Sequence, residues 1–469
     1  MKGKPGGKDL NGQRGREYCL NIIEMDKNRV PISRMYLSMA LPVVLTMVTT
    51  MVYNIADTWF ISAIGNTNLI AGVSLNAPVL TILMAFGNIY AQGGSSLISR
   101  LLGQQKKDSV RQVSSACFYL SILTGLICLA VMLVFRTPIL YLLGASEETM
   151  EYASAYFVWL AIGAPIIIAS YIPNNLLRSE GMSKEAMIDT MSGTILNIIL
   201  DPIFIFVFGL GAAGAAMATV VGYLFMDILG VVIILKKSSV LSVSLKESRT
   251  EGRYIRQIFS VGIPAAISNI MQSVSVIFVN QFLLPYGNDK IAAMGIALKV
   301  ALVGQLVLVG LTFGSLPLYG YYYGSRNREK FMELLHYCLK FICATAAVLT
   351  IVLVAAARPL IRFFVDDAGL IEAGTLMLRL QVVTLIFAGI VLLFTIVFQS
   401  MGRAKEMLFL TISRQGVIFV IVLFIASRVA GYYGIIASQA ISDLITAAFA
   451  IAMYQHWKKE DWGVDGQSG

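Results

Sequence analysis

Long apolar stretches alternate with short polar ones along most of the chain. The blocks from Met39 to Ile55, Ser115 to Phe135 and Val382 to Phe398 hold only apolar, small or weakly polar residues. Because an α-helix needs about 20 such residues to cross the apolar core of a bilayer, each block is long enough to form a transmembrane helix. The pattern predicts an all-α polytopic membrane protein.

Twelve such blocks are delimited by charged residues or by Gly/Pro clusters, and they predict twelve transmembrane helices. The segment 1–33 is polar and lacks an apolar signal-peptide core, so we expect the first helix to act as its own uncleaved insertion signal. The twelve predicted helices run roughly over 36–62, 69–98, 111–135, 152–177, 184–208, 213–235, 257–285, 291–323, 331–357, 374–398, 405–427 and 432–454.

The basic residues predict the orientation of these helices. Segments on the side of the termini hold 27 of the 36 Lys and Arg residues, and the opposite loops hold five. Basic residues are enriched in cytoplasmic loops, so we expect a multi-pass protein of the bacterial inner membrane with both termini in the cytoplasm. The net charge of +9 is spread over seven short loops. It therefore reflects topology and predicts no nucleic-acid partner.

The composition argues against an enzyme or a metalloprotein. Only 13% of the residues are charged, against roughly 25% in a soluble domain. The five cysteines form no CxxC pair and there are only two histidines, so neither a disulfide framework nor a zinc site is expected. The sequence also has no Walker A loop, HExxH motif or Ser/His constellation. We expect no enzymatic activity and no cofactor.

The two halves of the chain repeat each other. The motif from Ser179 to Glu185 (SEGMSKE) recurs from Ser400 to Glu406 (SMGRAKE), with Ser, Gly, Lys and Glu at the same positions. We call the shift along the sequence that brings Ser179 onto Ser400 the repeat offset. Six helices per half place the halves parallel, as two pseudo-symmetric six-helix bundles, an arrangement in which transporters alternate access around a central site. The predicted organisation is a cytoplasmic tail (1–33), an N-lobe (34–236), a cytoplasmic linker (237–255), a C-lobe (256–456) and a cytoplasmic tail (457–469).

Polar residues inside the membrane helices are the candidate functional residues, because an ionisable group within the bilayer is costly. Asp57 follows Tyr53 by four residues, and Asp201 follows Asn197 by four, so each pair shares a helix face. We expect Asp57, Asn197 and Asp201 to bind a proton or a cation such as Na⁺. Supporting cavity residues are Tyr53, Asn54, Asn174 and Thr219; helix-bending residues are Pro42 and Pro202; Gln272 and Lys299 are further candidates for a substrate cavity.

This cluster has no counterpart in the second half. The repeat offset places Asn197 on Ile418 and Asp201 on Val422, both apolar. Acids that only supported folding would be expected in both halves, so the asymmetry favours function. Lys299, Arg379, Asp227 and Asp443 could line a cavity or pair with one another, whereas Arg414 and Asp189 are expected near the cytoplasmic interface, where long side chains can snorkel.

Several stretches resemble the multidrug and toxic compound extrusion (MATE) family. They are Tyr53 to Ile61 (YNIADTWFI), Ser96 to Gly103 (SLISRLLG) and Asn197 to Pro202 (NIILDP). The last stretch, together with the repeated Gly-x-x-Lys-Glu loops, resembles the bacterial DinF-type branch of the family. The resemblance implies a secondary antiporter that exports organic cations or amphipathic drugs in exchange for H⁺ or Na⁺. It assigns the ion-binding positions to Asp57, Asn197 and Asp201. On the fourth helix, Tyr171, Asn174 and Asn175 compete for one polar position.

Two other functions are weighed against the antiporter. A flippase for a lipid-linked precursor would use Lys299 and Arg379 to grip phosphate, but such flippases usually carry several basic residues in the cavity. An intramembrane enzyme would need a catalytic motif, and none is present. We expect a monomer in the lipid bilayer whose partners are small organic cations or amphipathic molecules.

Overall fold

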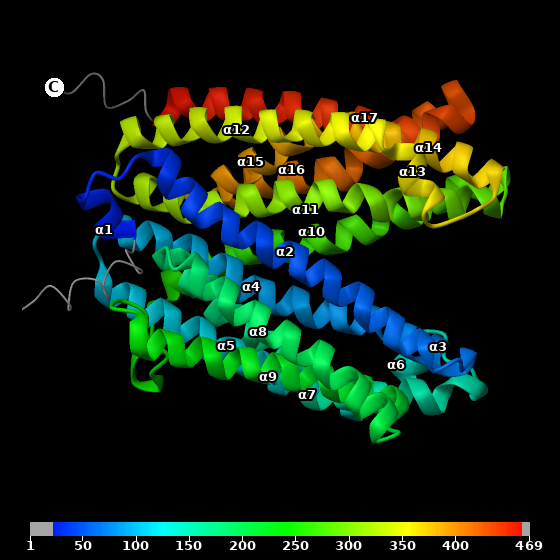
Figure 1. Cartoon of the computed structure of the whole chain (residues 1–469). Coiled ribbons are helices and arrows are strands. Elements are labelled where there is room, and N and C mark those ends of the chain that lie inside the picture. The colour runs from blue at the N-terminus through cyan, green and yellow to red at the C-terminus, as the bar shows by residue number, and fades with distance from the viewer. Residues whose placement is uncertain (1–21, 462–469) are drawn as a thin grey trace, which may run out of the picture.

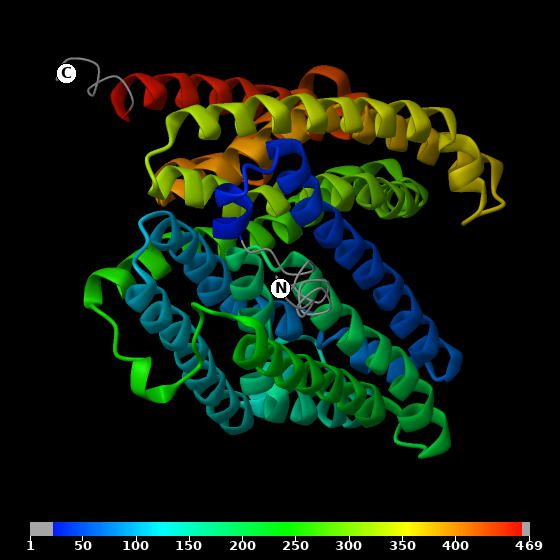
Figure 2. The ribbon, with the colours of Figure 1, turned by 60° about the vertical axis from the view of Figure 1, so that its left-hand side comes forward.

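The computed structural model describes residues 22–461, and this part of the chain is helical and contains no strand. Figures 1 and 2 show the helices running side by side as two bundles. The first half consists of α1 (Ile22–Lys27), α2 (Ile32–Ala63), α3 (Thr67–Ser74), α4 (Ala77–Gly103), α5 (Lys107–Val134), α6 (Arg136–Leu142), α7 (Glu147–Glu180), α8 (Ser183–Pro202), η1 (Ile203–Val207) and α9 (Gly211–Lys237). The second half consists of η2 (Leu245–Glu247), α10 (Gly252–Leu283), η3 (Leu284–Tyr286), α11 (Asn288–Gly324), α12 (Arg328–Ala355), α13 (Ala357–Arg362), α14 (Ala368–Val382), α15 (Leu385–Met401), α16 (Ala404–Gln415) and α17 (Val417–Asp461).

The described helices cross the membrane twelve times, as predicted. Ten spans are long and apolar enough to cross, and α14 with α15 forms an eleventh that is bent by 43°. The span Ala404–Lys459 holds two passes. Ser442 donates a hydrogen bond to the carbonyl of Arg414, although 28 residues of straight helix would extend roughly 42 Å. The chain therefore reverses between them, at Gly431, whose φ of +54° suits glycine.

Glycines allow the two lobes to approach closely on the side of the described termini. A Cβ on Gly93 of α4 would lie 2.2 Å from the carbonyl oxygen of Ile258 in α10. Gly314 of α11, which the repeat offset relates to Gly93, would place its Cβ 2.3 Å from the Cα of Ala40 in α2. The same repeat position thus makes an equivalent inter-lobe contact from each half.

Away from these crossings the lobes separate. In Figure 1 the bundles lie together on the left, near the described ends of the chain, and diverge towards the right, where α3 and α6 of one lobe face α13 and α14 of the other. Hydrogen bonds reinforce the closed side: Arg100 donates through Nη1 to the carbonyl of Met401 at 2.8 Å, and Gln399 donates to Gln92 at 3.1 Å. The structure is therefore closed at the end that carries the termini.

The segments predicted as polar tails are packed where the structure describes them. Residues 1–21 and 462–469, including Cys19, lie outside the described residues, but residues 22–33 are not a free tail. Ile22 of α1 is 0% exposed, against Gly181 of the first lobe, and Asp26 pairs with Lys330 of the second. At the other end α17 continues to Asp461. The sequence could not show this because the partners lie far from the tails in the chain.

The connection between the lobes is also packed rather than free. Ser114 of α5 donates a hydrogen bond to the carbonyl of Ser242 at 2.9 Å, and Tyr119 donates to the carbonyl of Val243 at 3.0 Å. Val240 is 1% exposed. The segment that links the halves therefore lies along α5 of the first lobe.

We predict that Gly93→Ala destabilises the protein, because the new methyl group would meet the backbone of Ile258. Over-packing of this kind costs about 1–3 kcal/mol. The matched control is Gly295→Ala in α11, where, apart from the adjacent residues and backbone of α11 itself, no atom of the described residues lies within 4 Å of the added Cβ. Thermal unfolding in detergent should give a lower Tm for Gly93→Ala and an unchanged or higher Tm for Gly295→Ala. Equal Tm values would show that the lobes do not need this close approach.

Candidate functional site

A cavity of about 350 Å³ lies within the first lobe. Its wall comes from α2, α4, α7, α8 and α9, and α11 closes it with Val309 and Phe313. Amide, hydroxyl and phenol groups dominate the polar part of the wall, together with one guanidinium, Arg178. Four residues predicted from the sequence lie on this wall: Tyr53, Asn174, Asn197 and Thr219.

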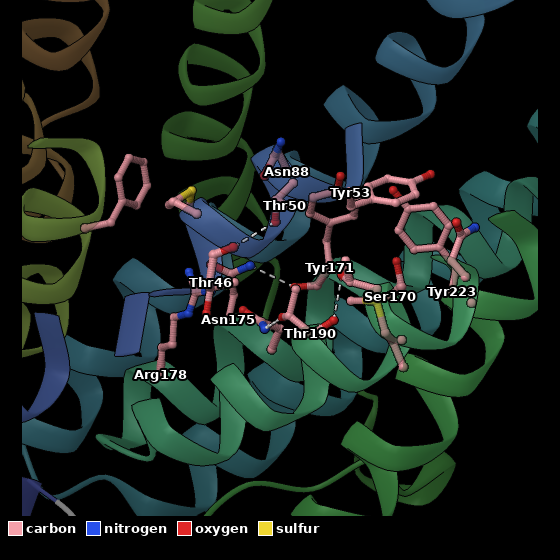
Figure 3. Close-up of a pocket in the computed structure, with 18 of the residues that line it drawn as sticks. Thr46, Thr50, Tyr53, Asn88, Ser170, Tyr171, Asn175, Arg178, Thr190 and Tyr223 are labelled. Atoms are coloured by element: carbon pink, nitrogen blue, oxygen red, sulfur yellow. Dashed lines mark hydrogen bonds between the residues drawn. The ribbon is translucent and has the colours of Figure 1, made fainter. Parts of the chain in front are cut away.

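The polar groups are arranged along the cavity in a definite order. Figure 3 shows Tyr53, Tyr171 and Tyr223 gathered at one end, whereas Arg178 lies at the other end below Thr46. Successive turns of α8 contribute Thr190, Thr194 and Asn197 between these ends. The polar part of the cavity wall therefore has aromatic hydroxyls at one end and a cation at the other.

Asp57 and Asp201 lie beside the tyrosine end. Asp201 is 0% exposed, and the charge of Asp57 is close enough to act on it. Tyr156 lies within electrostatic range of both acids and beside the Thr219 hydroxyl. Within the described chain, neither oxygen of Asp201 has a hydrogen-bond partner, and the same holds for one oxygen of Asp57 and for the amide oxygen of Asn197.

These unpartnered oxygens define what the site can do. Two carboxylates in a poorly solvated place repel each other unless a proton or a cation reduces the negative charge. The amide oxygen of Asn197 adds a further uncharged acceptor. Among residues 22–461 no three His, Cys, Asp or Glu side chains cluster to form a metal site.

Proline shapes the two helices that carry these acids. α8 ends at Pro202, directly after Asp201, and the chain continues as the π-helical turn η1. Such a change is expected where proline removes a backbone donor. Pro42 lies inside α2, and the Thr46 hydroxyl donates to its carbonyl at 2.9 Å.

The other predicted residues lie in different places. Asn54 directly follows Tyr53, so its side chain points away from the face of Tyr53, and it is exposed. Lys299 is also exposed and lies outside the walls of both central cavities. Tyr171, Asn174 and Asn175, the three candidates on α7, all line the first cavity. Asn174 is fixed by its amide, which donates to the carbonyl of Ala186 at 2.8 Å and to Thr190.

Sequence reasoning missed several wall residues. Tyr223 follows Thr219 by four residues on α9, and Thr190 and Thr194 precede Asn197 on α8 at intervals that place them on nearby faces. A four-residue step from Thr219 would have found Tyr223, and steps of three and seven residues from Asn197 would have found Thr194 and Thr190. Arg178 has no such signal, because its repeat position carries Gln399.

A second cavity of about 290 Å³ lies against the first. Its wall comes from α4, α10, α11, α15 and α16 and includes Gln272, as predicted for a substrate cavity residue, together with Gln305 and Arg414. Gln92, Val309 and Phe313 belong to both walls. The two cavities therefore meet at the boundary between the lobes.

The sequence interpretation placed Arg414 near the cytoplasmic interface. In the structure its side chain is instead buried in an ion pair. Its Nε donates to Asp443 at 2.9 Å, and the two side chains are only 10% and 4% exposed. Gln439 also donates to Asp443. The repeat offset places this pair on Gly193 and Gly222 of the first lobe, where a Cβ on Gly193 would lie 2.8 Å from the carbonyl oxygen of Gly222.

Comparison with known proteins gives a consistent result. The model of the MatE family matches residues 42–203 and 264–425, one segment in each half of the chain. The chain is 31% identical to the multidrug export protein MepA of Staphylococcus saprophyticus over 88% of this chain and 91% of that protein. It is also 31% identical to MepA of Staphylococcus aureus, over 90% and 93%. A solved structure described as the outward-facing conformation of a multidrug resistance MATE family transporter of the MOP superfamily superimposes with a TM-score of 0.85 at 25% identity, over 91% and 97% of the two chains.

We predict that Arg414→Met alone destabilises the protein, because it leaves Asp443 buried without its cation. Breaking a buried pair from one side costs about 3–5 kcal/mol, whereas replacing both partners with apolar residues is often neutral. Arg414→Met/Asp443→Leu should therefore recover the amount of monodisperse protein seen by size-exclusion chromatography in detergent. A double variant as unstable as the single one would contradict this interpretation.

Proposed function

The chain belongs to the MatE family, and on this basis we propose that it is a secondary active antiporter that exports organic cations or amphipathic drugs in exchange for H⁺ or Na⁺. The observation that carries the proposal is the pair of acids beside the first-lobe cavity, whose buried oxygens include several without a hydrogen-bond partner. The relatives named as multidrug export proteins support the substrate class. The protein acts as a membrane transporter, and we expect its termini in the cytoplasm.

Competition for negative charge explains how the exchange is coupled. Asp57 and Asp201 need a proton, Na⁺ or an organic cation to relieve their repulsion. A substrate cation and a coupling ion that neutralise the same acids disfavour each other's binding, because each can shift the protein only through its preferential affinity. The site is then filled by substrate in one direction and by the coupling ion in the other.

Alternating access uses the two lobes. The glycine crossings hold the end near the termini closed, and the lobes diverge at the opposite end. With cytoplasmic termini this is the state that exposes the cavities to the outside. The opposite state requires Gly93 and Gly314 to separate from Ile258 and Ala40 while the outer ends of the lobes approach each other.

The driving force limits what one ion can achieve. One pH unit supplies about 1.4 kcal/mol, and one charge crossing 100 mV supplies about 2.3 kcal/mol. One-for-one exchange of monovalent cations is electroneutral and uses only the first term. A second coupling ion would add the voltage term, so the number of ion sites decides how strongly substrate is concentrated.

The flippase alternative has less support. Its two proposed phosphate ligands do not line the central cavities, since Lys299 is exposed elsewhere and Arg379 lies in a pocket near α13. The basic residues that do line them have acidic neighbours: Arg414 pairs with Asp443, and Arg178 interacts with Asp189. A phosphate group would therefore find no free cluster of cations in these cavities.

We predict that Asp57→Asn and Asp201→Asn each abolish coupled export and leave the amount of folded protein unchanged. Each change removes an acid that the coupling ion and the substrate share, and it also removes the cost of burying a charge. Efflux of ethidium from proteoliposomes, driven separately by H⁺ and Na⁺ gradients, measures the effect and identifies the ion. If both variants were lost from the membrane, the acids would be structural instead.

The repeat partners provide a control in the other lobe. Ile418→Asn and Val422→Asn place uncharged polar groups where the second lobe is apolar, so we expect weaker packing or substrate fit but no change in ion coupling. The pH and Na⁺ concentration at half-maximal efflux should stay at the wild-type values. A shift as large as that of the first-lobe variants would mean that both lobes take part in coupling.

A further inference from the structure

Three charged side chains of the first lobe are not used by the transport cycle described so far. They are Arg178 on α7, Asp189 on α8 and Asp227 on α9. Asp189 is 0% exposed, and within the described residues neither of its oxygens has a hydrogen-bond partner. Asp227 also buries one carboxylate oxygen without a partner. A fully buried acid with no donor is costly, so this group calls for an explanation.

The position of Asp189 connects it to the ion-binding acids. Four residues of α8 follow one another at intervals of four and therefore lie on one side of the helix, in a stripe that winds gradually around its axis. They are Asp189, Gly193, Asn197 and Asp201. The twelve residues from Asp189 to Asp201 span roughly 18 Å. The stripe therefore has an acid at each end, and the cavity lined by Gly193 and Asn197 lies between them.

Asp189 is buried against α9, whereas Arg178 lies on the wall of the cavity. A Cβ on Gly230 of α9 would lie 3.2 Å from the Oδ1 atom of Asp189, so the carboxyl group touches the backbone of α9. Arg178 lines the cavity wall, and its charge acts on Asp189. Asp189 in turn acts on Asp227. Arg178 thus lies on the cavity wall within electrostatic range of Asp189.

Charged groups on the neighbouring helices leave this cluster with an excess of negative charge. Between its ends, α2 carries only Arg34 and Asp57. One turn from Asp189, Glu185 is bridged to Lys237 at 3.2 Å, and Glu180 accepts a hydrogen bond from Ser238. The cluster therefore has one guanidinium for two acids, and a proton would balance the charge. A metal ion fits less well, because Arg178 would repel it.

We propose that Asp189 and Asp227 share a second proton site of the first lobe, so that each cycle carries a proton there in addition to the ion held by Asp57 and Asp201. The inference rests on the proposed antiport. When the pair loses its proton, Arg178 is held towards Asp189. When the pair is protonated, that attraction weakens, and the positive charge of Arg178 disfavours an organic cation in the cavity. Binding of the cation therefore expels the proton, which passes to solvent on the side to which the lobe is open.

Proton release on substrate binding tests this proposal directly. Tetraphenylphosphonium is added to the purified full-length protein in weakly buffered detergent, and a pH-sensitive dye reports the protons released. Asp189→Asn should release about one proton fewer per bound cation than the wild type, because the two states of the protein then differ by one proton less. Asp227→Asn should show a similar loss, and it serves as the second variant if Asp189→Asn does not fold. Unchanged release in both variants would overturn the proposal.

A double variant separates a proton site from simple charge balance. Arg178→Gln/Asp189→Asn removes one charge of each sign and should restore the yield of folded protein. If Asp189 only balances Arg178, this variant will release as many protons as the wild type; if it carries a proton, release stays low. Asp189→Glu should retain release. The matched control is Glu185→Gln, an acid one turn from Asp189 that is already bridged to Lys237, and it should release the wild-type number.

Failure of this inference can be told apart from failure of the antiport itself. If the wild type neither binds nor exports tetraphenylphosphonium, the proposed function fails for this cation. The proton site is then judged by acid titration of the protein without substrate. Wild-type protein should take up about one proton more than Asp189→Asn between basic and acidic pH. Equal uptake would overturn the site whatever the result of the transport assay.

Discussion

A charge buried within the membrane needs a partner, and the two lobes meet this requirement in opposite ways. In the second lobe Arg414 and Asp443 satisfy each other, and Gln439 adds a further donor. At the corresponding positions the first lobe has Gly193 and Gly222, which let α8 and α9 pack closely. On α8, Asp189 precedes this contact and Asp201 follows it, and the carboxylate oxygens of both have no hydrogen-bond partner among the described residues. The buried charge of Arg414 is thus balanced within the second lobe, whereas the first lobe holds acids whose oxygens have no partner among the described residues.

The same duplication also produces the contacts that keep the lobes together. Gly93 and Gly314 occupy one repeat position and bring each half against the backbone of the other. Because a tight backbone contact either forms or is lost, the lobes have few intermediate arrangements available to them. The electrostatic asymmetry therefore concerns the interior of each lobe, whereas the steric symmetry concerns the contact between the lobes.

Periodic features of the sequence predicted much of this architecture. The apolar blocks gave the twelve passes, the repeat gave two parallel bundles, and the four-residue spacing placed Asn197 with Asp201 on one helix face. Contacts between distant residues could not be found in this way. Arg414 and Asp443 meet only because the chain reverses at Gly431, and a local hydropathy pattern cannot distinguish a paired buried arginine from one that extends to the interface. For the same reason α1 was assigned to a polar tail, although its partners are Gly181 and Lys330.

The contact of α1 with both lobes has a consequence for how the protein is made. Asp26 pairs with Lys330, a residue 304 positions later in the chain. At the usual pace of synthesis of about 5–20 residues per second, roughly 15–60 s separate the two on the ribosome. During that interval α2 is in the membrane without α11, the second-lobe helix that packs against it. α2 therefore completes its contacts only after α11 has been made, and the contact between the lobes can form only once residues of the second lobe have been synthesised.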